Sequence, residues 1–206
     1  MKPGIIILAA GDSSRMGTPK QLLMYAGETL LQRTIHTAQA VAETVVVVLG
    51  AEASTLVRAC NPSAGDTYST IQNNNWREGM GTSVSLGLRT LLDAHPDTHA
   101  AIFLLCDQPL VTSDILQQII ALHETTGSPI VAAAYNGTLG VPALFDSSLF
   151  PALLALNGTD GARKIIQQHR SYALGVPFPA GAIDIDTPAD YARLVDISLS
   201  QNPIPA

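Results

Sequence analysis

The 206-residue chain has few charged residues, few aromatic residues and few cysteines. Only 14% of its residues are charged and 5% are aromatic, whereas 47% are hydrophobic, which favours a large buried core over disorder. The formal charge is −6 and the basic residues are scattered, so the basic stripe typical of nucleic-acid-binding proteins is missing. A polyanionic ligand would have to be held by a few placed Arg and Lys side chains or through a metal ion.

Long apolar runs and metal-binding spacings are missing too. No window approaches the ~18 apolar residues of a membrane-spanning helix, and IIILAA (residues 5–10) is shorter than the core of a signal peptide. Cys60 and Cys106 show no CxxC spacing, and the five histidines show no metal-ligand spacing. We therefore expect a soluble cytoplasmic protein with reduced thiols and without nucleic-acid or membrane partners.

Short β-branched runs alternate with amphipathic stretches through residues 1–135. The runs are almost continuously apolar, which is typical of strands buried on both faces of a parallel sheet. They cover residues 4–10, 44–50, 68–73, 100–106 and 129–135. The stretches between them have helical spacing and cover residues 28–43, 52–60, 82–95 and 112–127. This alternation predicts a doubly wound, mostly parallel sheet of the Rossmann-like α/β class, with three layers.

The pattern changes after Tyr135, where NGTLGVP (136–142) is rich in turn residues. Beyond this segment the sequence predicts helices at 147–156, 159–169 and 187–197, and short strands at SYALGVP (171–177) and AIDID (182–186). No repeat or linker divides the chain, so we expect one domain over residues 1–197 with halves at 1–135 and 136–197, and a frayed tail at 198–206.

The stretch LAAGDSSRMGTPK (8–20) leaves the first predicted strand and becomes at once a loop rich in donors. Ligands of open parallel sheets bind beyond the carboxyl ends of the strands, and a glycine-rich loop with free backbone N–H groups binds anions. Arg15 and Lys20 add positive charge. This composition favours a nucleoside triphosphate. The alternative, an ordinary surface turn, does not require both basic residues beside Ala9 and Ala10.

Two well-known phosphate loops do not fit this stretch. A Walker A loop needs GxxxxGK[ST] running into a helix, whereas Pro19 biases the chain away from helical geometry just before Lys20. The dinucleotide fingerprint GxGxxG is absent because Asp12 and Ser13 follow Gly11.

The loop closely resembles the L-A-[AG]-G-x-S-x-R-M-G-x-x-K signature of nucleotidyltransferases with a GT-A-like fold, and among them it looks most like the molybdenum cofactor cytidylyltransferases. Three further segments resemble motifs of the same group: NNNWREGMGTSVSLGL (73–88), LLCDQPLV (104–111) and DIDTPADY (184–191). The resemblance implies an enzyme whose nucleotide-binding half is 1–135 and whose acceptor-binding half is 136–197.

The resemblance also assigns roles to individual residues. Arg15 and Lys20 would act in catalysis by neutralising the triphosphate and the charge that develops on it. Gly140, Pro142 and Arg163 would contribute to the acceptor pocket. The nucleotide-binding residues would be Leu8, Ala9, Ala10, Gly11, Ser13, Ser14, Arg15, Lys20, Asn73, Gly79, Ser83 and Asp107.

Asp107 and Asp186 are the candidate ligands of Mg²⁺. Asp107 follows an apolar run and should stand at the tip of a strand, where Mg²⁺ with one or two carboxylates and several waters would meet a triphosphate. Asp184 and Asp186 would point the same way from a strand, and the resemblance places the metal role on Asp186. The structural alternatives are a turn capped by Asp107 and a helix capped by Asp186 with Pro188 at its first position.

The implied reaction is Mg²⁺-dependent transfer of CMP from CTP to the phosphate of molybdopterin or its molybdenum-loaded form, with release of pyrophosphate. A phosphate with a second pKa of about 6 needs no general base. Ala10 makes the loop LAAG, which in the resembling families goes with cytidylyl transfer, whereas LAGG goes with guanylyl transfer.

One departure concerns the acceptor, because the chain has Gly140-Val141-Pro142 where many members have Gly-His-Pro. Two alternatives therefore stay open. The first is a transferase of the same fold that acts on a sugar phosphate or another phosphorylated molecule. The second is a non-catalytic chaperone that carries the cofactor to a molybdenum hydroxylase, which would also be the client of the enzyme.

Overall fold

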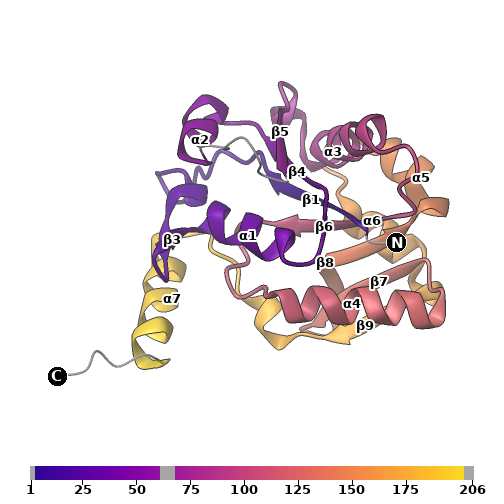
Figure 1. The fold of residues 1–206 in the computed structure, drawn as a ribbon. Helices are drawn as coiled ribbons and strands as arrows, with labels where there is room; N and C mark the ends of the chain where they lie inside the picture. Colours follow the sequence, from indigo (N-terminus) through magenta and orange to yellow (C-terminus); the bar gives the residue numbers. More distant parts are fainter. Residues whose placement is uncertain (1–2, 61–67, 202–206) are drawn as a thin grey trace.

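The computed structural model describes residues 3–60 and 68–201. At its centre lies a seven-stranded sheet with the order β5-β4-β1-β6-β8-β7-β9 (Figure 1). The strands are β1 (Gly4–Ala9), β4 (Val45–Leu49), β5 (Tyr68–Gln72), β6 (Ala100–Leu105), β7 (Ile130–Tyr135), β8 (Thr138–Asp146) and β9 (Ala173–Pro177). A separate antiparallel pair joins β2 (Met24–Tyr25) to β3 (Glu28–Thr29).

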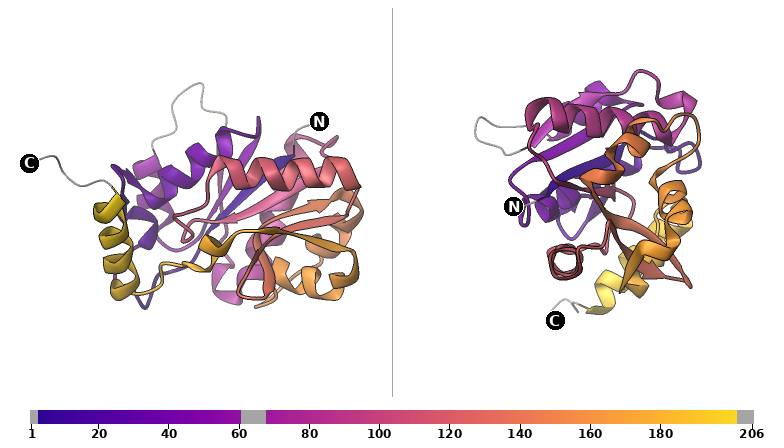
Figure 2. Two further views of the ribbon diagram at one scale, coloured as in Figure 1. Left: turned by 90° about the horizontal axis from the view of Figure 1, so that it is seen from below. Right: turned by 90° about the vertical axis from the view of Figure 1, so that its right-hand side faces the viewer.

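Helices cover both faces of the large sheet and complete three layers (Figure 2). One face packs against α1 (Leu30–Gln39), α2 (Ala53–Cys60) and α4 (Ser113–Thr126). The other face packs against α3 (Met80–Ala94), α5 (Phe150–Leu154) and α6 (Ala162–Gln168). Because both faces are covered, β1 and β4 are buried along their whole length, which explains their uninterrupted apolar sequences.

The last helix, α7 (Pro188–Gln201), lies beside β3 (Figure 1). It packs on β2 through a small apolar cluster that includes Tyr25, Ile185 and Leu194. Short 3₁₀ helices complete the connections: η1 (Lys20–Leu22), η2 (Trp76–Glu78), η3 (Ser147–Leu149), η4 (Arg170–Tyr172) and η5 (Pro179–Ala182).

The predicted α/β class with a mostly parallel sheet is confirmed. Each of the five apolar runs contains a strand, and β1 pairs in parallel with both β4 and β6. The helix predicted at 187–197 continues to Gln201, and residues 202–206 lie outside the described part. Cys106 is buried, whereas the side chain of Cys60 lies outside the described part. No helix within residues 3–60 and 68–201 is long and apolar enough to cross a lipid bilayer.

The strand β8 is a feature that the sequence did not predict. Asn136 (φ 51°) and Gly137 (φ 71°) form a two-residue turn with both residues in the left-handed region, which folds β8 back antiparallel onto β7. On its other side β8 is antiparallel to β6, but that pairing stops at Phe103 opposite Ala143. Residues 138–142 therefore extend past the paired part of β6, at the carboxyl end of the parallel strands.

The strand predicted at AIDID is wrong. Residues 183–186 belong to no strand in the described part of the chain. The buried Ile185 holds the segment instead, and its N–H donates to the backbone oxygen of Asp107 at 2.9 Å. The segment therefore crosses the end of β6 and brings Asp186 near Asp107.

The cap of α7 also differs from the structural alternative. The side chain of Asp190 accepts from the N–H of Thr187 at 2.8 Å, and Thr187 Oγ1 accepts from the N–H of Asp190 at 3.3 Å. This reciprocal pair is a capping box with Thr187 at the N-cap and Pro188 as the first helical residue. The helix therefore does not need Asp186 as its cap.

Candidate active site

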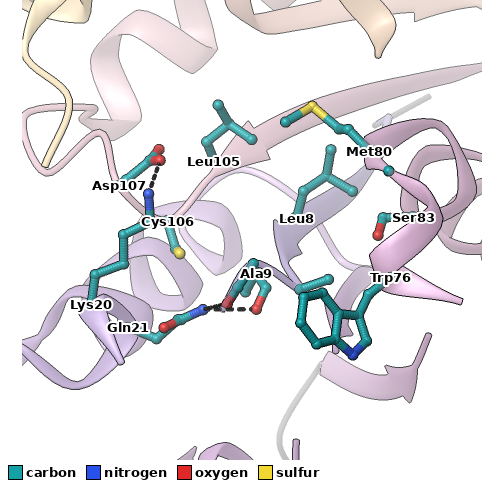
Figure 3. Close-up of a pocket in the computed structure, with 13 residues that line it drawn as sticks. Leu8, Ala9, Lys20, Gln21, Trp76, Met80, Ser83, Leu105, Cys106 and Asp107 are labelled. Carbon is teal, nitrogen blue, oxygen red and sulfur yellow. Dashed lines mark hydrogen bonds and ion pairs between the residues drawn. The ribbon is translucent and has the colours of Figure 1, made fainter. Parts of the chain in front are cut away.

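A pocket of about 190 Å³ lies at the carboxyl ends of β1 and β6. Eight of the residues predicted to bind nucleotide line it, namely Leu8, Ala9, Ala10, Gly11, Lys20, Gly79, Ser83 and Asp107. The other lining residues are Gln21, Trp76, Met80, Leu105 and Cys106. Figure 3 shows Lys20 and Asp107 on one side of this first pocket and Trp76, Met80 and Ser83 on the other. It therefore has a charged side and a side with a flat aromatic ring.

Gln21 fixes the loop that borders the first pocket. Its side chain is 1% exposed, and its Nε2 donates to the carbonyl oxygens of Ala9 at 3.0 Å and Gly11 at 3.1 Å (Figure 3). Ser13 Oγ donates to Gln21 Oε1 and accepts from the N–H of Lys20, which ties the two ends of the loop together. Sequence reasoning missed Gln21 because its partners are carbonyl groups, which leave no side-chain pattern.

Four charged side chains meet at the mouth of the first pocket. Lys20 Nζ donates to Asp107 Oδ2 at 2.6 Å and to Asp186 Oδ1 at 3.0 Å. Arg15 Nη2 donates to Asp186 Oδ2 at 2.8 Å. The structure thus brings together both predicted catalytic residues and both predicted metal ligands, although they come from distant parts of the chain.

The pKa values of Lys20 and Asp186 are shifted by their neighbours in this cluster. Burial opposes the charged form of Lys20, but the charge and hydrogen bonds of Asp107 and Asp186 outweigh it and raise the pKa of Lys20. Burial likewise opposes ionisation of Asp186, but Lys20 and Arg15 outweigh it and lower the pKa of Asp186. Both shifts favour the charged forms of Lys20 and Asp186 at neutral pH.

A second pocket of about 330 Å³ adjoins the first and shares Leu8, Met80 and Leu105 with it. Its remaining lining residues are Gln108, Tyr135, Thr138, Leu139, Gly140, Val141, Thr159, Gly161, Ala162, Arg163 and Asp184. Two of the predicted acceptor residues, Gly140 and Arg163, line this second pocket, whereas Pro142 does not and its neighbour Val141 does. Two ligands bound in the two pockets would lie side by side.

Residues 5–172 match the MobA-like NTP transferase domain family. The chain belongs to this family. It is therefore a nucleotidyltransferase enzyme, and the family uses nucleoside triphosphates and phosphorylated cofactor substrates.

Three curated relatives of this MobA-like transferase carry different names. It is 31% identical to nicotine blue oxidoreductase of Paenarthrobacter nicotinovorans, over 79% of this chain and 80% of the relative. It is 30% identical to purine catabolism protein PucB of Bacillus subtilis and 27% identical to molybdenum cofactor cytidylyltransferase of Escherichia coli, in both cases over 90% of this chain and 92% of the relative. The relatives thus resemble this chain over most of its length but carry names that point to different activities.

Solved structures of Rv0371c from Mycobacterium tuberculosis share this fold. One is 30% identical, has a TM-score of 0.78 and covers 95% of this chain and 98% of its own. Another, a complex with manganese, is 28% identical, has a TM-score of 0.72 and covers 95% of this chain and 99% of its own. Members of the family typically depend on a divalent metal ion.

The carboxylates of this MobA-like transferase fit a hard divalent cation. Asp107 Oδ1 is buried and has no hydrogen-bond partner among the described residues, so this carboxylate has an oxygen available for a cation. Within the described ranges no group of three or more Asp, Glu, His or Cys side chains forms a metal site. Two carboxylates with water and phosphate oxygens completing the shell are what Mg²⁺ or Mn²⁺ accepts. Neither oxygen of Asp107 caps a turn in the described part of the chain.

Two predicted nucleotide residues have structural roles that the sequence did not indicate. Asn73 is 3% exposed, and its Nδ2 donates to Thr82 and Ser83, both at 2.8 Å, so it orients Ser83 from behind the first pocket. Gly79 has φ 124°, and a Cβ there would lie 2.2 Å from the carbonyl oxygen of Gly158. Gly79 therefore allows close contact between the start of α3 and the backbone at Gly158.

Ser13, Ser14 and Arg15 do not line the first pocket. The N–H of Ser14 donates to Asp12 Oδ1 at 3.1 Å, and Arg15 is exposed while it pairs with Asp186. In this conformation the Ser14 N–H and the Arg15 guanidinium therefore have partners within the protein.

Proposed function

We propose that the chain transfers a cytidylyl group from CTP to the phosphate of molybdopterin or its molybdenum-loaded form, with release of pyrophosphate. The observation that carries the proposal is the pair of adjoining pockets, which share Leu8, Met80 and Leu105 and meet beside the charged cluster. CTP occupies the first pocket and the acceptor occupies the second, so the attacking phosphate reaches the α-phosphate near Lys20 and Asp107.

The choice of CTP is supported by two observations. Ala10, the second alanine of LAAG, lines the first pocket. The cytidylyltransferase of Escherichia coli matches 90% of this chain. Ser83 offers a hydroxyl to the base or ribose, and Trp76 presents its ring on the same side (Figure 3).

The chain catalyses the transfer by positioning and by charge. Arg15 and Lys20 leave their carboxylate partners to neutralise the β- and γ-phosphates and the charge that develops as pyrophosphate departs. The loop of residues 8–20 holds the phosphates with the N–H groups of Gly11 and Ser13, and with that of Ser14 once it leaves Asp12. The acceptor phosphate is already ionised at neutral pH and needs no base from the protein.

Asp107 and Asp186 would hold the divalent metal, which we propose to be Mg²⁺. When bound, Mg²⁺ supplies further neutralisation of the triphosphate. Arg163 faces the second pocket with its positive charge and attracts the acceptor phosphate.

A second candidate, transfer to a sugar phosphate or another phosphorylated molecule, is favoured by one observation. Val141 lines the second pocket at the position where many resembling enzymes have histidine, so this wall has one fewer polar group. An acceptor less polar at this point than molybdopterin would suit it.

The deciding experiment measures pyrophosphate release in Mg²⁺ with CTP, GTP, ATP or UTP, each with and without molybdopterin. The proposal expects release with CTP that depends on molybdopterin. Lys20→Ala should abolish most of it, while Lys164→Ala, which removes an exposed lysine paired with Asp160, should not. Binding of CTP without turnover on molybdopterin but with turnover on a sugar phosphate would establish the second candidate. Binding of both ligands without any turnover would favour a cofactor-carrying chaperone.

A further inference from the structure

Gln108 has a buried amide group that the proposed chemistry has not used. The residue follows Asp107 at the end of β6 and is 4% exposed. Its Nε2 donates to the carbonyl oxygen of Gly181 at 3.0 Å and to the hydroxyl oxygen of Tyr135 at 3.4 Å. Its Oε1 is buried and has no hydrogen-bond partner among the residues that the structure describes. Buried amide oxygens without a partner are rare in proteins because the lost hydrogen bond is costly.

The orientation of this amide is fixed from three sides. The carbonyl oxygen of Gly181 can accept a hydrogen bond but cannot donate one, so a flipped amide would place two oxygens against each other. The hydroxyl of Tyr135 donates to the carbonyl oxygen of Val141 at 3.1 Å, which leaves its lone pair facing Gln108. Gly181 is packed so closely on Tyr135 that a Cβ would lie 2.7 Å from the ring. The position of Oε1 is therefore set before any ligand binds.

Gln108 lines the second pocket, together with Arg163 and Asp184. Asp184 contributes a carboxyl group to the lining of this pocket. Leu105 and Leu139 form an apolar part of the wall of the second pocket. The pocket thus offers hydrogen-bond acceptors along its inner wall and a cation on Arg163.

We propose that Gln108 determines acceptor specificity by accepting, at Oε1, a hydrogen bond from an N–H or O–H group of the acceptor. The inference rests on the proposed function, because it takes the second pocket as the acceptor site. It names a chemical requirement for the acceptor: besides its phosphate, the molecule presents a polar hydrogen that reaches the end of β6. An acceptor without that hydrogen leaves Oε1 buried and unpaired, and the site rejects it.

The test compares Gln108→Met with the wild type. Methionine keeps the length of the side chain but removes the amide. Gln118→Met, on the exposed face of α4, is the matched control for the same chemical change. The fluorescence of Trp76, the single tryptophan and a lining residue of the first pocket, reports CTP binding. Circular dichroism and melting temperature show that each variant is folded.

If Gln108 selects the acceptor, Gln108→Met raises the KM for molybdopterin about 10- to 100-fold, because a donor on the acceptor is left unpaired. The Kd for CTP stays within twofold of the wild type, and kcat at saturating acceptor falls much less than KM rises. Tyr135→Phe, which keeps Oε1 but loosens its orientation, gives a smaller rise.

The outcomes separate the two proposals. If the wild type turns over molybdopterin and Gln108→Met behaves like Gln118→Met, the role of Gln108 is wrong and the proposed function stands. If molybdopterin binds without turnover, the proposed function is wrong, and the Kd of molybdopterin for the wild type and Gln108→Met decides the role of Gln108. If the wild type neither binds nor converts molybdopterin, both proposals are wrong.

Discussion

Replacing Lys20 by alanine should change metal binding and nucleotide binding in opposite directions. In the structure Nζ of Lys20 lies 2.6 Å from Asp107 Oδ2 and 3.0 Å from Asp186 Oδ1, which is where a divalent cation would bind if both carboxylates held it. The lysine therefore competes with the metal until a triphosphate draws it away. Without Lys20, Asp107 and Asp186 lose the ammonium group that they share, and they attract a metal ion more strongly.

The size of the effect follows from the charges and their exposure. Two unit charges about 4 Å apart interact by about 4 kcal/mol at an effective dielectric constant of 20. The side chain of Asp186 is 35% exposed, so solvent screens part of this interaction. We therefore expect Mn²⁺ to bind Lys20→Ala without nucleotide at least about tenfold more tightly, which is about 1.4 kcal/mol. Turnover should fall by about 10²- to 10³-fold, the cost of one preorganised electrostatic donor.

Electron paramagnetic resonance of free Mn²⁺ measures the affinity of each protein for the metal, and the fluorescence of Trp76 measures its affinity for CTP. The variant should also gain more in melting temperature on addition of Mn²⁺ than the wild type does, because the metal relieves repulsion between Asp107 and Asp186. Lys164→Ala is the control and should leave both affinities unchanged. A folded Lys20→Ala protein that binds Mn²⁺ no better than the wild type would refute the idea that lysine and metal share one place.

Three further predictions concern the frame of the site. Gly79→Ala should lower the free energy of unfolding by about 2 kcal/mol or more, because a strained φ and a backbone clash coincide there. The control Gly127→Ala, also at positive φ but with open space around it, should lower the free energy of unfolding by about 1 kcal/mol. Denaturant unfolding compares the two variants. Gln21→Met should cost about 1–3 kcal/mol and weaken CTP binding, since two loop carbonyls lose their donor; an unchanged Kd for CTP would contradict this role. Hydrogen bonds from Thr187 lower the pKa of Asp190 from 3.8 to about 2, so its capping stabilises the fold above about pH 4 and is lost as the pH falls towards 2. Asp190→Asn should therefore lower the melting temperature at pH 7, and the difference from the wild type should shrink over that range.

The sequence predicts the parallel part of the fold because a strand that is buried on both faces is a continuous apolar run. Each apolar run in β1, β4 and β6 is long enough to identify without knowledge of its neighbours. The strand β8 was not predicted, because Asn136-Gly137, Gly140 and Pro142 make the start of this segment resemble a turn. The prediction for AIDID was wrong for the opposite reason. The segment alternates like a strand, but it pairs with no strand in residues 3–60 and 68–201, and Ile185 is buried in the cluster that includes Tyr25 and Leu194.

The residues of the site also fall into those that the sequence predicted and those that it did not. Lys20 and Asp107 are 87 residues apart, but the strands and the resemblance place both at the same edge of the sheet. Gln108 could not be singled out, since its main partner is a carbonyl group 73 residues away and nothing local marks it. Gln21 could not be identified for the same reason, because its amide nitrogen donates to the backbone carbonyl groups of Ala9 and Gly11. Charged groups that converge on a ligand leave a pattern in the sequence, whereas amides that bind backbone carbonyls leave none.

The limited pairing between β6 and β8 has a consequence for how such enzymes diverge. Because the ladder stops at Phe103, the first residues of β8 lean on β7 and not on the strand that carries Asp107. Leu104 and Leu105 keep β1 as their partner. The hairpin around Asn136 can therefore change in length or sequence without moving the strands that border the first pocket. Under the proposed function, a change in this hairpin would alter the part of the acceptor pocket that Thr138, Gly140 and Val141 line, while Gln108 and the first pocket would stay as they are.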